Sequence, residues 1–124
     1  MATKLNDSAY RRAQNLIKEG HYVLDQRDDW SEHQPSAATE NSFIEEHGWN
    51  EYQKWFLAVD EEEAEETKAR YKFPYGDFEN VHRCGVISAE SRAGQYHYYD
   101  VERSAQHLLS MLNELTRTGG ARRA

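Results

Sequence analysis

The chain has 124 residues, a formal net charge of −7 and a single cysteine, Cys84. This length suits one domain with a single core, and one cysteine excludes an intrachain disulfide and a cysteine-rich zinc site. A net-negative chain is also a poor general ligand for nucleic acid, because Lys and Arg supply most non-specific affinity. No window is apolar enough to cross a membrane and no signal peptide is recognisable, so we expect a cytoplasmic protein without a membrane partner.

The first predicted element is a helix over 7–19, with Asp7 or Ser8 as its N-terminal cap and Gly20 at its C-terminal end. The aromatic and β-branched segment 21–24 then predicts a short strand. It leads into an irregular acidic stretch over 25–34. The wider region 25–66 contains most of the acidic residues of the chain but only two basic ones, so the charge distribution is bipolar.

A second helix is predicted over 36–47, where Pro35 and Ser36 mark the start and Gly48 the end. The segment 49–59 fits helical spacing at its beginning and strand alternation at its end. We therefore expect a helical or turn start that continues into a strand over 55–59. The charged run 60–68 is predicted to be a loop or a single exposed turn.

The segment 70–74 predicts an edge strand, because Pro74 has no N–H to donate to a neighbouring strand. Asp77 is a plausible cap for a third helix, which we predict to start at Phe78 or Glu79 and to end near Ala93. His82 then lies within an apolar arc of that helix. A fourth helix begins at Asp100, and its leucine-rich stripe is expected to pack on the third.

These elements predict an α+β fold. We expect one helix-rich domain over 1–117, with four helices and a small antiparallel sheet of two or three strands drawn from 21–24, 55–59 and 70–74. The tail over 118–124 is predicted to be disordered.

Three candidate site residues could converge around Tyr75, where the extended segment meets the third helix: Asp77, His82 and Arg92. An acid, an imidazole and a guanidinium could together bind a carboxylate or phosphate, or serve catalysis. The alternative is an internal brace that fixes the turn, with His82 at the edge of the core and bonded to a backbone carbonyl. We favour the brace, since charge networks of this kind are often structural.

A second group comprises Asp28, Asp29, Glu32 and His33. Carboxylates and an imidazole within six residues could bind a divalent metal. However, the spacing matches neither a His-Glu-x-x-His pattern nor a calcium loop with its central glycine. We therefore expect an acidic loop with no metal, and no cofactor for the protein.

The remaining candidates form a predicted binding surface: Trp30, His33, Trp55, Tyr75 and Asp77. The chain has more aromatic residues than its helix stripes require, and such residues often anchor interfaces. The alternative is that they complete a small core.

Several segments resemble a family of small uncharacterised bacterial proteins: Asp-Trp-Ser-Glu-His-Gln-Pro-Ser-Ala over 29–37, Phe-Ile-Glu-Glu-His-Gly-Trp over 43–49, Arg-Tyr-Lys-Phe-Pro-Tyr-Gly-Asp-Phe over 70–78, and Val-His-Arg-Cys-Gly over 81–85. The pattern from Pro74 to Gln95 is more distantly similar to a short module in phage-associated proteins of unknown function. The resemblance implies a shared fold unit and supplies no catalytic residue.

The function that we favour from the sequence is a non-catalytic binding or protein-interaction module of the bacterial cytosol, whose partner is another protein or a second copy of the chain. The alternative is a small hydrolase or metal-assisted enzyme, which would use His33 or His82 with Asp28, Asp29 or Asp77. Nucleic-acid binding through Arg83 and its basic neighbours is the least favoured, given the net charge.

Overall fold

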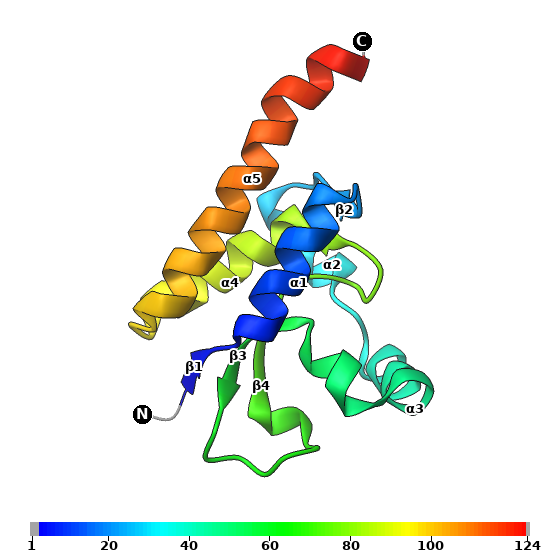
Figure 1. Ribbon diagram of the computed structural model, residues 1–124, viewed down its shortest axis with the longest axis vertical. Coiled ribbons are helices and arrows are strands. Elements are labelled where there is room, and N and C mark those ends of the chain that lie inside the picture. Colours follow the sequence, from blue (N-terminus) through cyan, green and yellow to red (C-terminus); the bar gives the residue numbers. More distant parts are fainter. Residues whose placement is uncertain (1–2, 124) are drawn as a thin grey trace.

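A three-stranded antiparallel sheet lies at one end of the molecule in the computed structural model (Figure 1). Its strands are β1 (Thr3–Leu5), β3 (Phe56–Asp60) and β4 (Tyr71–Pro74), in the order β1-β3-β4. Predicted strands over 55–59 and 70–74 are thus confirmed to within one residue. Pro74 lies on an edge strand, opposite Phe56, as its missing N–H requires. The structure describes residues 3–123, and the side chains of 3–115.

Two predictions about strands need correction. The third strand of this sheet is β1, which sequence patterning missed because three residues carry too little periodicity. The segment predicted over 21–24 forms β2 (Tyr22–Val23), but it does not join the antiparallel sheet. It pairs in parallel with β5 (Val81–His82), so that Val23 lies opposite His82.

Three helices cover the sheet and the parallel pair: α1 (Asp7–Lys18), α4 (Arg83–Gln95) and α5 (Tyr99–Arg123). Figure 1 shows α1 crossing the middle of the molecule and α5 extending beyond the rest. Helices α4 and α5 pack on each other as predicted, through the small side chains of α4 and the apolar stripe of α5. The core residues at this interface are Val86, Ala89, Ala93, Val101, Ala105, Leu108 and Leu112. The tail predicted over 118–124 falls in the part of α5 whose side chains lie outside the description, so its disorder stays a prediction.

The remaining helices are α3 (Ala37–Gln53), the short α2 (Trp30–His33) and two 3-10 turns, η1 (Arg27–Asp29) and η2 (Lys68–Arg70). Ser36 caps α3 by accepting the Thr39 N–H at 3.1 Å, and Gly48, with φ 85°, breaks it where the sequence predicted an end.

The prediction that a helix begins at Phe78 or Glu79 is wrong. Asp77 Oδ1 accepts the backbone N–H groups of Glu79 at 3.0 Å and Asn80 at 2.7 Å, so Asp77 closes a turn instead of capping a helix. Phe78 takes a left-handed φ of 73°, which is incompatible with a helix start. The chain therefore runs into β5, and α4 begins only at Arg83. His82 consequently lies on a strand and not on a helical arc.

Candidate functional site

Five polar side chains meet where β2, β5 and the short helix α2 come together; we call them the Asp25 cluster. They are Asp25, His33, Asp77, His82 and Cys84. Asp25 follows β2 by two residues, His82 ends β5, and Cys84 lies in the first turn of α4. The parallel pairing of Val23 with His82 brings the ends of the two strands side by side. His33, the last residue of α2, is the remaining member of the cluster.

Asp25 is the centre of the cluster. Its Oδ2 lies 2.6 Å from His82 Nδ1 and 2.7 Å from His33 Nδ1. Its Oδ1 accepts the backbone N–H of Cys84 at 2.7 Å, and its carbonyl oxygen accepts a hydrogen bond from Arg83 at 3.2 Å. Both the side chain and the backbone of Asp25 are therefore fixed to the start of α4.

A second carboxylate completes the environment of His82. Asp77 Oδ2 lies 2.8 Å from His82 Nε2, and the side chain of His82 is only 7% exposed. Both ring nitrogens thus face carboxylates. An ionised carboxylate only accepts hydrogen bonds, so both nitrogens carry a proton and His82 is an imidazolium between two anions. The predicted bond from His82 to a backbone carbonyl is therefore wrong; the partners of His82 are Asp25 and Asp77.

The pKa values follow from this pairing. Burial alone would raise the pKa of Asp25, but the hydrogen bonds from Cys84, His82 and His33 outweigh it and lower the pKa to about 2. Burial alone would lower the pKa of His82, yet its bonds to Asp77 and Asp25 raise it. Burial, with the nearby Asp25 carboxylate, raises the pKa of the Cys84 thiol. The metal-free cluster therefore holds ionised carboxylates, a cationic His82 and a protonated thiol.

Four of these side chains aim their donor atoms at one point. The available ligand atoms of Asp25, His33, His82 and Cys84 all lie within 4.8 Å of one another. Cys84 Sγ is 3.8 Å from His33 Nδ1, the same nitrogen that faces Asp25. A nucleophilic triad needs the acid and the nucleophile on opposite nitrogens of the imidazole. The contacts of His33 therefore do not form such a triad, whereas four donor atoms within 4.8 Å of one another could surround a single ion.

The side chain of Trp30 packs closely against one side of the cluster. The ring centroids of Trp30 and His82 are 6.1 Å apart, and Trp30 is buried. Gly85 is the residue that permits this approach, since a Cβ there would lie 2.8 Å from the Tyr75 carbonyl oxygen and 2.9 Å from the Trp30 ring. His33, with a side chain 35% exposed, forms the solvent side of the cluster.

The structure separates the predicted candidates. Asp77 and His82 are in contact, but Arg92 is not part of their network; its guanidinium lies 5.7 Å above the Phe73 ring. Among the weak metal candidates, only His33 joins the cluster. Asp28 and Glu32 are exposed, and Asp29 uses its Oδ2 to accept the Gln26 N–H.

Three residues of the predicted binding surface are buried: Trp30, Trp55 and Tyr75. Tyr75 donates its hydroxyl to the Lys54 carbonyl oxygen at 2.7 Å and stacks on Trp55 with ring centroids 5.4 Å apart. In this structure these rings complete the core, which corrects their prediction as a surface. His33 and Asp77 remain partly accessible.

The sequence does not single out Asp25 and Cys84 as members of a cluster. Its patterns indicate only that Asp25 begins an acidic stretch and that Cys84 is the single cysteine of the chain. The available signals were an acid directly after a β-branched and aromatic strand, and a His-x-Cys pair at the start of a helix. Neither is informative alone, because the parallel pairing of β2 with β5 is what brings them together.

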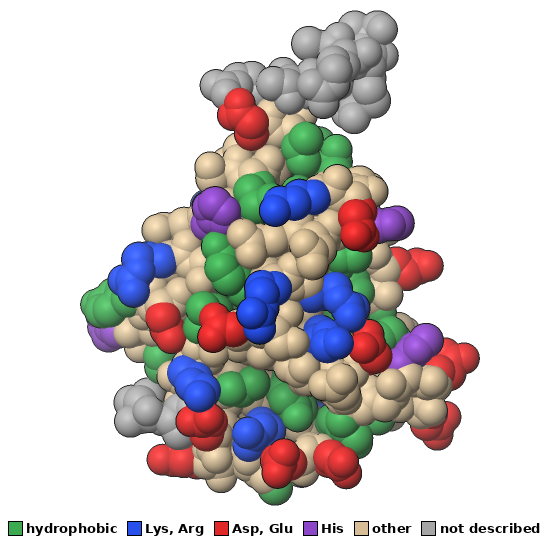
Figure 2. Space-filling model, viewed as in Figure 1, with side chains coloured by type: hydrophobic (Ala, Val, Ile, Leu, Met, Phe, Trp, Pro, Cys, Tyr) green, Lys and Arg blue, Asp and Glu red, His purple; other side chains and the backbone are tan. Residues whose placement is uncertain are grey.

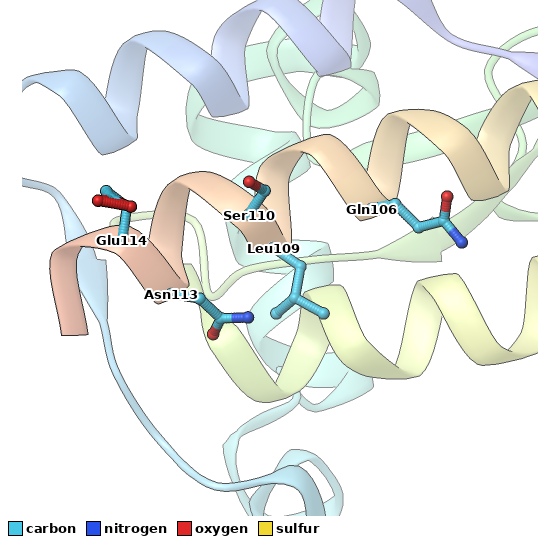
Figure 3. A pocket seen from close by; sticks show the side chains of 5 residues that line it. All are labelled: Gln106, Leu109, Ser110, Asn113 and Glu114. Carbon is cyan, nitrogen blue, oxygen red and sulfur yellow. The ribbon is translucent and has the colours of Figure 1, made fainter. Parts of the chain in front are cut away.

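Another surface hollow lies on α5, and its side chains do not converge on one point as those of the Asp25 cluster do. It is lined by Gln106, Leu109, Ser110, Asn113 and Glu114. Figure 3 shows that these side chains come from one helix and diverge, with Ser110 and Glu114 on the side away from Leu109 and Asn113. Asn113 accepts a hydrogen bond from Arg83 Nε at 2.9 Å, which ties α5 to the start of α4. We assign this hollow a structural role.

Comparison of the chain with protein-family models, curated proteins and solved structures found no match. Within the described residues, no helix is long and apolar enough to cross a membrane.

Proposed function

We propose that this protein is a metal-binding domain, in which Asp25, His33, His82 and Cys84 hold one Zn²⁺ ion or an ion of similar preference. The observation that carries the proposal is the convergence of one carboxylate, two imidazoles and one thiol within 4.8 Å. A soft thiolate with imidazoles favours zinc over Mg²⁺ or Ca²⁺, which prefer oxygen ligands alone.

The groups around these ligands also suit a metal site. A ligating histidine usually donates its other N–H to a carboxylate, which fixes the ring and makes it a better ligand. Asp77 stands in that position, 2.8 Å from His82 Nε2, and leaves Nδ1 directed at the centre. In the same way, the Cys84 N–H occupies Oδ1 of Asp25 and leaves Oδ2 for the ion.

The distances require a small adjustment for an ion to bind. Zinc bonds of 2.0–2.3 Å in a tetrahedron place ligand atoms roughly 3.4 Å apart. The two contacts of Asp25 Oδ2 with imidazole nitrogens are shorter, at 2.6 and 2.7 Å, because they are hydrogen bonds in the metal-free form. Metal binding would replace these protons, and Cys84 would bind as the thiolate.

Four protein ligands would complete a tetrahedral shell, which favours a structural ion over one that activates water. Three of the ligands, Asp25, His82 and Cys84, are also buried. The ion would tie the acidic segment after β2 to the strand-to-helix junction of β5 and α4. This is consistent with a non-catalytic binding module, and it uses the two histidines that the sequence offered for a metal-assisted role.

Metal titration of the chelator-treated protein tests the proposal. We expect Zn²⁺ to bind at one equivalent and, at a hundredfold excess over Kd, to raise the melting temperature by about 10 °C. Co²⁺ should produce an absorption band from the cobalt–thiolate bond. Cys84→Ser should remove that band, and His33→Ala should weaken zinc binding at least tenfold. His21→Ala, which changes an exposed histidine outside the cluster, is the matched control. No stoichiometric binding, or a cobalt band that survives in Cys84→Ser, would disprove the proposal.

A further inference from the structure

A groove lined by basic and hydroxyl-bearing side chains lies beside α2. Two adjoining cavities, of about 290 and 420 Å³, share Gln34 and Arg92 in their linings. The first is bounded by η2 and β4, and the second by η1, α2 and the exposed face of α4. We call these two cavities together the basic groove.

The first cavity contains three cationic side chains, Lys68, Lys72 and Arg92, and one carboxylate, Glu40. Lys68 Nζ lies 3.3 Å from Glu40 Oε1, so these two charges are paired. Within the described part of the chain, Lys72 and Arg92 have neither an ion pair nor a side-chain hydrogen bond. Their donor groups are therefore available to a ligand.

The second cavity adds further donors. Arg27 lies in its lining with three hydroxyl side chains, Ser31, Ser88 and Ser91, and Asp28 is its one carboxylate. Over the whole groove the basic residues outnumber the acidic ones, in a chain whose net charge is −7. A depression that offers cations and hydroxyl donors is complementary to an anion.

Phe73 forms part of the floor in an unusual backbone conformation. Its φ of 63° lies in the left-handed region, which non-glycine residues adopt in only a few per cent of cases. Phe73 separates Lys72 from Pro74 and carries the guanidinium of Arg92 above its ring. Lys72 and Arg92 both lie in the lining of this cavity, so their charges can act on one bound anion.

We propose that the basic groove binds a small phosphate-bearing ligand, with Lys72 and Arg92 as its principal contacts. Arg92 provides a planar, two-donor contact for phosphate oxygens, and Lys72 provides a point charge. Arg27 and the serines of the second cavity extend the site to a ligand longer than a single phosphate. The nucleic-acid alternative is less well supported, since the net charge of the chain is −7 and phosphate contacts by Lys and Arg supply most non-specific affinity.

Isothermal titration with inorganic pyrophosphate, at low ionic strength and with a chelator present, tests this site independently of the metal. We expect saturable binding, weakened about tenfold by Lys72→Gln and by Arg92→Gln. Arg103→Gln, an exposed arginine on α5, is the control and should leave binding unchanged. Equal loss in the control would mean that only the overall charge matters, and would overturn the site. So would the absence of binding, or binding only to a single-stranded oligonucleotide.

Discussion

The Asp25 cluster and the basic groove are neighbours in the structure, but their charged side chains differ in burial and in pairing. In the cluster, Asp25 and His82 are buried, His33 and Asp77 are partly exposed, and these side chains pair at 2.6–2.8 Å. No buried side-chain N or O atom among the described residues lacks a hydrogen-bond partner. In the groove, Lys72 and Arg92 lie partly or fully exposed without a carboxylate. Helix α2 separates the two regions, with His33 in one lining and Gln34 in the other.

The energetic cost of the charged groups differs between the two regions. Burying ions costs several kcal/mol each, and their mutual attraction offsets this only with good geometry. Unpaired surface charges carry no such cost, and they indicate a site only when several converge on one cavity.

Figure 2 shows how charged side chains are distributed over one face of the protein. Lys and Arg side chains gather across its middle, and Asp and Glu side chains lie among them and along the lower edge. Surface charges of this protein also form ion pairs, such as Arg12 with Glu51 at 3.1 Å and Lys4 with Glu61 at 2.8 Å. Exposed pairs of this kind are worth about 0.2–1 kcal/mol.

The largest difference between the two regions should be in the free energy of unfolding when one side chain is removed from each. His82→Ala leaves Asp25 and Asp77 without their shared cation, so the free energy of unfolding of the metal-free protein should fall by about 3 kcal/mol. Arg92→Gln, in the groove, should change it by less than about 0.5 kcal/mol. Chemical denaturation of both variants measures this, and similar values for the two would remove the distinction between the regions.

Packing around the cluster should be almost as sensitive. Gly85→Ala places a Cβ 2.8 Å from a backbone oxygen of Tyr75 and 2.9 Å from the Trp30 ring, so we expect a loss of about 1–3 kcal/mol. The fluorescence of the chain should change as Trp30 is displaced. Ser91→Ala, on the exposed face of the same helix, should be neutral in both measurements. An unchanged stability in Gly85→Ala would show that Trp30 is not held tightly against the cluster.

Lowering the pH should destabilise the folded protein, because Asp25 becomes protonated. Burial would raise the pKa of this carboxyl, but its hydrogen bonds lower it from 3.8 to about 2 in the folded state. A group with a depressed pKa stabilises the fold above its unfolded value and loses that contribution as the pH falls through the folded value. We therefore expect the metal-free protein to lose about 2 kcal/mol between about pH 4 and pH 2.

Denaturant titrations across this pH range check the prediction. His82 does not cancel the loss, because its raised pKa keeps it protonated, and its contribution is lost only as the pH rises. Asp25→Asn should flatten the acid slope. A slope that is unchanged in this variant would assign the acid sensitivity to other carboxyls.

The smallest expected effect concerns the independence of the two regions. Lys72→Gln should change the affinity for zinc by less than about twofold, since sites without shared partners behave additively. Cys84→Ser should likewise leave pyrophosphate binding intact. A larger effect in either direction, measured by titration of each ligand, would show that α2 couples the two sites.

Much of the fold could be predicted because its signals are local. The helix over 7–18, the break at Gly48, the edge strand ending at Pro74 and the apolar stripe of α5 each depend on spacing or on one residue's backbone chemistry. The candidate site was predicted only in part. The sequence singles out Asp77 and His82 as one group and His33 in another, whereas in the structure all three belong to the Asp25 cluster and Arg92 lies outside it.

The sequence by itself determined the class of fold, the packing of α4 on α5 and the types of chemistry that the chain can offer. Only the tertiary structure decided which of these groups meet. A two-residue parallel pairing between β2 and β5, which leaves almost no periodic signal, brings Asp25 to His82 and Cys84 across more than fifty residues. Patterns within a segment report local geometry, whereas a site made of convergent ligands depends on contacts between segments that no local pattern encodes.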